Sequence, residues 1–109
     1  MQRYFRIGST LAAIAVFCGQ AEALDRRVRI VNESKHAIVS FFGANVGVRD
    51  WPESLLGGDA LKPGASVVLD LEDGSGYCRF RFRAIFDDGV ELVRQSVNVC
   101  EVGTYRYTE

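Results

Sequence analysis

The chain of 109 residues carries 13 lysine and arginine and 14 aspartate and glutamate side chains, so its net charge near neutral pH is −1. This balance excludes the strongly basic surface that attracts nucleic acid. Its length is that of one small domain, with no internal repeat, low-complexity segment or linker.

The first 23 residues have the pattern of a secretory signal peptide. Two arginines precede an apolar run over residues 11–18, and a small-x-small cleavage motif ends at Ala23. The run is shorter than the ~20 residues that a membrane-spanning helix needs, and no second such stretch follows. We therefore predict that residues 1–23 are removed and that residues 24–109 form a single domain, periplasmic or secreted, without a membrane span.

Cys78 and Cys100 are the only cysteines left once the leader is removed. An even pair in an exported chain is typical of a disulfide, and a domain this small gains much from such a crosslink. We predict a Cys78–Cys100 bridge that stabilises the fold by roughly 3 kcal/mol. A redox-active pair is the alternative, but such pairs usually have the closer C-x-x-C spacing.

Turn residues divide the mature chain into short segments in which apolar residues recur with period two, the pattern of half-buried strands. We expect strands over residues 27–32, 37–42, 66–72, 77–86, 90–100 and 104–108, of which the first two form a hairpin. Pro63-Gly64 predicts one turn, and Asp87-Asp88-Gly89 predicts a tight hairpin. Pro52 favours a short helical turn near residues 52–56.

These elements contain no long helix and no alternation of strands with helices. We therefore predict an all-β fold, a small antiparallel β-sandwich or barrel of six to seven strands.

Three arginines alternate with phenylalanines along the fourth expected strand. Residues two apart share a face of a strand, so the phenylalanines should fill the core while Arg79, Arg81 and Arg83 face outward. Two interpretations remain open. Asp70 and Glu72 could pair with the arginines from the preceding strand, or the arginines could form an anion-binding stripe.

The segment from Asn45 to Asp59 is long for a loop in a compact domain, and long loops are often functional. Asn45, Asp50 and Trp51 are therefore candidate binding residues. The alternative is that Trp51 and the leucines of this segment only cover one end of the core.

Residues that could carry catalysis or hold a metal are scarce. His36 is the only histidine, and we expect it to lie exposed in a turn without a role. Residues 70–76 resemble a calcium loop only loosely, because Gly74 stands where an oxygen ligand belongs. We expect no catalytic residue, no metal and no other cofactor.

Several runs of the sequence resemble a group of small exported bacterial β-domain proteins. The runs are WPESLLGGDALKPG (51–64), GYCRFRFRAIFDDG (76–89) and VNVCE (97–101). Members share a leader, a V-x-I-x-N strand, a W-x4-L-G motif, an L-x-P-G turn and a GYCR…FDDG…VNVC frame, and the match covers nearly the whole mature chain. Where this chain has Arg81, the group often has an aspartate.

The resemblance implies an extracytoplasmic β domain and assigns it no activity. Some members carry the label argininosuccinate lyase, but that enzyme resembles a large helical tetramer, which a short strand-forming chain cannot build. We expect a binding or interaction module for a protein or an anionic ligand of the cell envelope. The alternative is a small inhibitor or immunity-type protein that inserts the 45–59 loop into a target enzyme.

Overall fold

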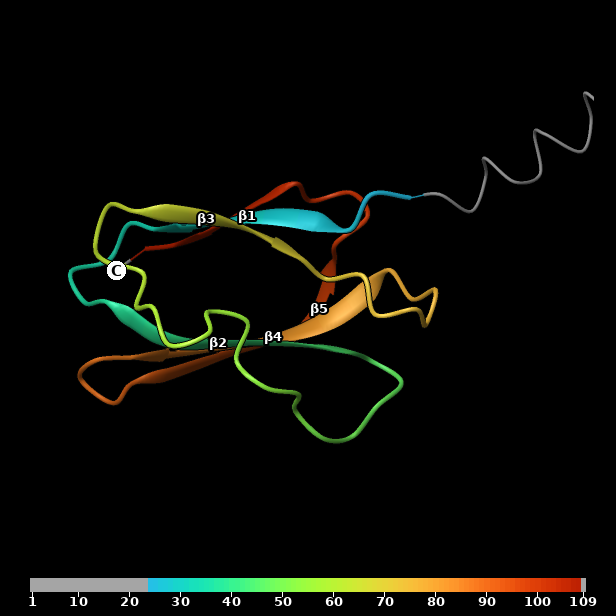
Figure 1. Cartoon of the computed structure of the whole chain (residues 1–109), viewed down its shortest axis with the longest axis horizontal. Coiled ribbons are helices and arrows are strands. Elements are labelled where there is room, and N and C mark those ends of the chain that lie inside the picture. The colour runs from blue at the N-terminus through green and yellow to red at the C-terminus, as the bar shows by residue number, and fades with distance from the viewer. Residues whose placement is uncertain (1–23, 109) are drawn as a thin grey trace, which may run out of the picture.

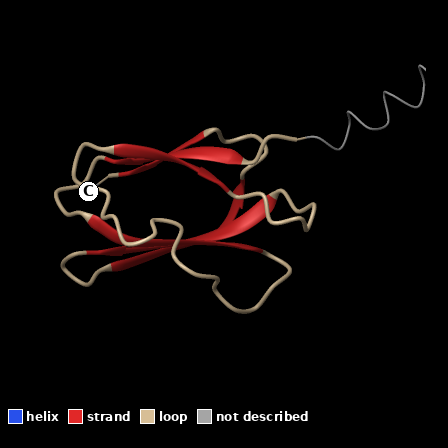
Figure 2. Cartoon of the chain, viewed as in Figure 1, coloured by secondary structure: helices blue, strands red, loops and turns tan. Residues whose placement is uncertain are grey.

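The computed structural model describes residues 24–108, in which two three-stranded sheets pack face to face (Figure 1). The strands are β1 (Arg27–Asn32), β2 (Ile38–Asn45), β3 (Ser66–Asp70), β4 (Arg79–Phe86), β5 (Glu91–Asn98) and β6 (Thr104–Tyr107). The described residues contain no helix (Figure 2), and hence none that could cross a membrane. The predicted all-β sandwich is confirmed, whereas the predicted leader, residues 1–23, lies outside the described residues.

The strand order is β3-β1-β6 in one sheet and β2-β4-β5 in the other. All pairings are antiparallel except that of β1 with β6, which is parallel. The Asp87-Asp88-Gly89 turn joins β4 to β5 as predicted, and Gly89 takes a positive φ of 89° that suits glycine. The predicted hairpin of the first two strands is wrong, because β1 and β2 belong to different sheets.

Asn32, at the end of β1, organises the crossing between the sheets. Its side chain is fully buried, and its Nδ2 donates to the carbonyl oxygens of His36 at 2.8 Å and Leu61 at 2.9 Å. Its Oδ1 accepts a hydrogen bond from the amide of Ser34 at 3.0 Å. Since these bonds satisfy the buried amide, they favour a loop that leaves β1 for the second sheet over a tight hairpin.

The core lies between the sheets and follows the alternation seen in the sequence. Val28 and Ile30 of β1 are fully buried against Phe41 of β2 and the phenylalanines of β4. Phe41 and Phe82 meet edge to face, with ring centroids 5.0 Å apart. Burial of each such side chain is worth about 1.5–3 kcal/mol, which explains why β4 turns its phenylalanines inward and its arginines outward.

The predicted disulfide between Cys78 and Cys100 is present. It joins the residue before β4 to the turn after β5, with Cα atoms 5.3 Å apart. The amide of Val99 also donates to the carbonyl of Cys78 at 2.8 Å. The crosslink therefore closes the far end of the β4–β5 pair, opposite the tight hairpin.

The predicted helical turn near residues 52–56 is absent, and residues 55–58 form a non-helical turn instead. The amide of Leu55 donates to the carbonyl of Phe41 at 2.8 Å, and the Ser54 hydroxyl accepts from the Phe41 amide at 3.1 Å. Because the edge of β2 binds these groups, the segment extends along the strand rather than coiling on itself.

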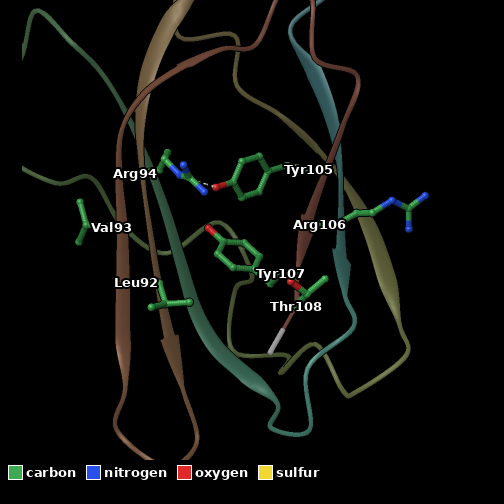
Figure 3. A pocket seen from close by; sticks show the side chains of 7 residues that line it. All are labelled: Leu92, Val93, Arg94, Tyr105, Arg106, Tyr107 and Thr108. Carbon is green, nitrogen blue, oxygen red and sulfur yellow. Dashed lines mark hydrogen bonds between the residues drawn. The ribbon is translucent and has the colours of Figure 1, made fainter.

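The two sides of the sandwich differ. On the side where β2 faces β3, which we call the closed side, residues 54–61 cover the edge of β2, and the amide of Ile38 donates to the carbonyl of Leu61 at 2.9 Å. On the side where β5 faces β6, which we call the open side, both strands end their sheets (Figure 3). Residues 91–96 of β5 are all exposed there.

Candidate functional site

The outer face of β4 carries Arg79, Arg81 and Arg83, as the sequence predicted. Their expected partners Asp70 and Glu72 do not reach them, because β3 lies in the other sheet and pairs with β1. Of the two interpretations left open by the sequence, the one that pairs the arginines with Asp70 and Glu72 is therefore wrong. It assumed that strands consecutive in sequence are neighbours in a sheet, whereas β3 and β4 lie in different sheets.

Two of the arginines bind β5 instead. The guanidinium of Arg83 contacts Glu91, with Nε and Nη2 each 3.0 Å from Oε1. Nη1 of Arg79 donates to the hydroxyl of Ser96 at 3.1 Å. Both bonds join neighbouring strands of one sheet, so these two side chains are already engaged within the domain.

Arg81 binds the long loop after β2. Its Nη2 donates to the carbonyl oxygens of Val48 at 3.0 Å and Arg49 at 3.2 Å, and its guanidinium carbon lies 4.4 Å from the centroid of the Trp51 ring. The same indole packs near Phe42 of β2, with centroids 6.3 Å apart. Cation–π stacking and two carbonyl bonds thus hold the 46–52 segment against the sheet.

A cleft of about 420 Å³ opens on the closed side, between this loop and the segment that follows β3. Its apolar lining comes from Val48, Trp51, Pro52, Leu55, Leu71 and Phe80. Its acidic lining comes from Asp50, Asp70, Glu72 and Asp73. The arrangement combines apolar walls with carboxylates from two separate segments of the chain.

The carboxylates of the cleft have different partners. Oδ2 of Asp73 accepts from Nδ2 of Asn45 at 2.9 Å. Burial acts to raise the pKa of Asp73, but hydrogen bonds from Ser75 and Asn45 outweigh it and lower the pKa below its ordinary value. For Asp50 no hydrogen bond or ion pair is found among residues 24–108. Asp50 is therefore the carboxylate most available to a ligand.

Arg26 organises one wall of the cleft, and sequence reasoning missed it. It is buried, its Nη1 lies 2.9 Å from Oε1 of Glu72, and Nε and Nη2 donate to the carbonyls of Tyr77 at 2.7 Å and Gly76 at 3.0 Å. A signal for it existed, because the period of two places residue 26 on the inward face of Val28. The guanidinium ties residues 72–77 to the start of β1.

The candidates chosen from the sequence therefore separate into two groups. Asn45, Asp50 and Trp51 line one cleft, and the guanidinium of Arg81 stacks on the Trp51 ring. Arg79 and Arg83 lie on the outer face of the sheet and bind β5.

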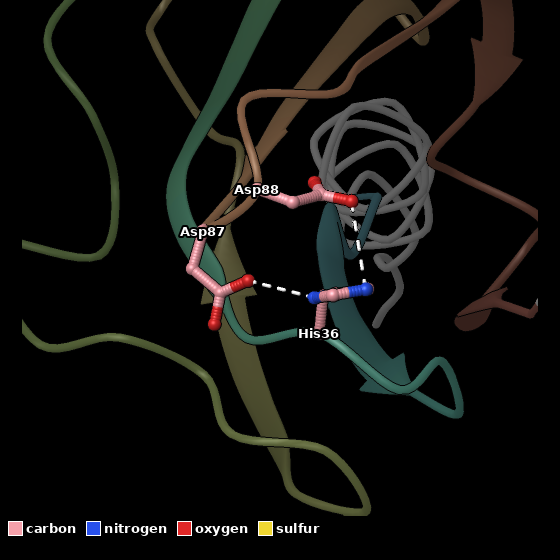
Figure 4. A group of neighbouring side chains, drawn as sticks. All are labelled: His36, Asp87 and Asp88. Atoms are coloured by element: carbon pink, nitrogen blue, oxygen red, sulfur yellow. Dashed lines mark hydrogen bonds and ion pairs between the residues drawn. The ribbon is translucent and has the colours of Figure 1, made fainter.

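His36 is exposed, as expected, but it has partners. Its Nδ1 lies 2.9 Å from Oδ1 of Asp87 and its Nε2 lies 3.5 Å from Oδ2 of Asp88 (Figure 4). One ligand atom from each residue lies within 4.8 Å of the others, so the group could hold a metal ion. However, the two carboxylates face different ring nitrogens, and a single metal ion binds only one nitrogen of a ring, so the three residues do not converge on one ion.

Comparison with known proteins found no protein-family model, curated protein or solved structure that matches this chain.

Proposed function

We propose that the chain is an exported binding module and that the cleft on its closed side is the binding site. A disulfide in a small β domain is compatible with a location outside the cytoplasm, periplasmic or secreted. The observation that carries the proposal is the convergence of apolar walls with Asp50, a carboxylate that has no partner among the described residues.

The chemistry of the cleft favours a cationic group on an apolar stem, such as an arginine or lysine side chain of a partner protein in the cell envelope. Carboxylates at the rim would bind the charge, and Trp51 and Leu71 would pack against the stem. An anionic ligand, which the arginines of β4 suggested, is disfavoured because Arg81 and Arg83 already have partners.

The test is a titration of the isotope-labelled domain, observed by NMR, with a short blocked peptide in which one arginine is flanked by leucines. A matched peptide has citrulline in place of the arginine, which keeps the shape and removes the charge. We expect the arginine peptide to shift the amide signals of Val48, Trp51 and Leu71. If both peptides shift them equally, charge recognition by the cleft is refuted.

Matched variants sharpen the test. Asp50→Asn removes the unpartnered charge and should weaken binding of the arginine peptide roughly tenfold, as the loss of one charge-assisted hydrogen bond would. Asp59→Asn removes a carboxylate of the same loop that does not line the cleft, and it should leave binding unchanged. Equal weakening by both changes would point to a diffuse charge effect.

A second candidate is a small inhibitor that uses the outer surface of the 45–59 loop. The observation that favours it is the exposure of Val46 and Val48, both apolar, on a loop held by Arg81. Trp51 would then act as the anchor of the loop rather than the inserted residue. Inhibition of an envelope hydrolase that is lost on Val46→Lys but kept on Asp50→Asn would favour this function over the first.

A further inference from the structure

The open side of the sandwich contains a second hollow, separate from the proposed binding cleft. It has a volume of about 290 Å³ and lies between β5 and β6, where Leu92 and Arg94 face Tyr105 and Tyr107 (Figure 3). The residues of β5 that point between the sheets here are those opposite Ala84 and Phe82 of β4. This groove would be part of the core if a further strand covered it.

Tyr107 has a hydroxyl group without a partner at the bottom of the groove. The side chain is 5% exposed, and its Oη is buried and makes no hydrogen bond within the described chain. A buried hydroxyl without a partner is costly, so a group that accepts its hydrogen bond would be bound favourably. Burial raises the pKa of Tyr107, aided by Tyr105 and opposed by the charge of Arg94, so the hydroxyl remains a donor.

Arg94 supplies a charge next to this hydroxyl. Its Nε donates to the Tyr105 hydroxyl at 2.8 Å, and its guanidinium carbon lies 5.8 Å from the centroid of that ring. No carboxylate of residues 24–108 lies within ion-pair distance of it. The terminal nitrogens of the guanidinium and the Tyr107 hydroxyl are thus donors without an acid, and a carboxylate is the group that accepts from both.

Arg106, which also borders the groove, does not compete for that role. Figure 3 shows its side chain directed away from the two tyrosines, and its Nη1 lies 2.8 Å from Oε2 of Glu33. The positive charge inside the groove is therefore that of Arg94.

The walls of the groove favour an extended polypeptide as the source of the carboxylate. β5 and β6 are each the last strand of a sheet, and an edge strand directs alternate backbone N–H and C=O groups away from its only neighbour. Leu92 and Val93 of β5 are 43% and 47% exposed, one facing each side of the sheet. A strand laid along β5 would cover both and would pair with the free backbone groups.

We propose that the open side binds an extended acidic segment of a partner protein, which adds to β5 and places a carboxylate between Arg94 and Tyr107. Because Arg94 and Leu92 are two residues apart on the inward face of β5, the segment carries an apolar side chain two residues from its acidic one. This site does not depend on the cleft of the closed side, and either can fail without the other.

The experiment uses short blocked peptides of alternating threonine and valine with one central glutamate, labelled with a fluorophore. The control peptide has glutamine at the centre. Fluorescence anisotropy should show about tenfold tighter binding of the glutamate peptide, the gain expected from a charge-assisted pair of hydrogen bonds. Amide signals of β5 should shift in NMR spectra while those of Val48 and Leu71 do not, which separates this site from the proposed cleft.

Three variants assign the recognition to residues. Arg94→Gln should abolish the preference for glutamate over glutamine, and Tyr107→Phe should reduce it several-fold while the domain stays folded, since only an unpaired oxygen is lost. Arg29→Gln, on the outer face of the other sheet, should leave the preference intact. An unchanged preference in folded Arg94→Gln and Tyr107→Phe proteins would overturn the proposal.

Two other results would also overturn it. Free glutarate that competes as well as the peptide binds would show a small-molecule carboxylate site rather than strand addition. Dimerisation in sedimentation experiments that blocks the peptide and disappears on Val93→Lys would assign the edge to a second copy of this chain.

Discussion

The closed and open sides of the sandwich differ in whether their edge strands are covered. Each side ends in two edge strands, one from each sheet. On the closed side, the loop after β2 turns back along the edge of its own strand and is bound by Arg81 and by the backbone of Phe41. On the open side nothing in the described chain covers β5, and Tyr107 keeps an unpaired buried hydroxyl.

The difference extends to charge. The closed side gathers acids from two segments around an apolar cleft, whereas the open side presents Arg94 with two tyrosines. A domain with a nearly neutral overall balance therefore has an acidic cleft on one side and a groove with a cationic side chain on the other. The net charge does not reveal this separation of acidic and basic side chains, because the separation follows from the positions of the strands in the fold.

The largest effect on stability that we expect comes from removal of the disulfide. This change also tests whether the crosslink stabilises only the closed side of the sandwich or both sides. Replacing Cys78 and Cys100 by alanine should lower the free energy of unfolding by about 3 kcal/mol, the value for a closed loop of this size. Urea denaturation measures the loss. Hydrogen exchange should accelerate first in residues 71–78 of the closed side.

An equal acceleration in residues 99–103, which lead into β6, would contradict this expectation. The crosslink would then support the two sides alike.

A smaller effect compares two arginines, one from each side. Arg26→Met should cost about 2 kcal/mol, because Glu72 and the carbonyls of Gly76 and Tyr77 lose a buried partner. Arg94→Met should cost less than 1 kcal/mol, since Arg94 is exposed and makes one hydrogen bond to Tyr105. Urea denaturation of both variants gives the comparison.

Similar losses in the two variants would mean that the open side is as integral to stability as the closed one. That result would also weaken the view of Arg94 as a residue kept for a partner.

Local pattern accounts for much of what the sequence predicted correctly. The alternation in β4 identified the buried phenylalanines, and Asp87-Asp88-Gly89 identified the hairpin, because both depend on residues close in the chain. With the predicted leader set aside, two cysteines remain, and these left one intramolecular pairing, which the structure contains.

Long-range neighbours could not be read in the same way. The alternation says which face of a strand is buried but not which strand lies beside it, so Asp70 and Glu72 were matched with arginines of the wrong sheet. The Tyr107 hydroxyl lacks a partner because of how distant strands pack around it, and no local sequence pattern predicts such packing. Asn45, Asp50 and Trp51 were chosen as candidates because a long loop is itself a local signal, and the structure places all three at one cleft.

The last and most local effect concerns the anchor of the loop on the closed side. Arg81→Gln should lower the free energy of unfolding by about 1 kcal/mol, through the loss of stacking on Trp51 and of bonds to the carbonyls of Val48 and Arg49. Its more specific consequence is local, since amide exchange in residues 46–52 should rise well before global unfolding. Hydrogen-exchange mass spectrometry measures both quantities.

Arg79→Gln is the matched control for this change. It lies on the same face of β4, but among residues 24–108 its side chain is hydrogen-bonded to Ser96 alone, so its loss should leave exchange in the loop unaltered. If the two variants change the loop equally, Trp51 is held by the sheet as a whole and not by Arg81. Packing of Trp51 on Phe42 would then be what orders the loop on the closed side. In that case Arg81 would be available to bind an anion.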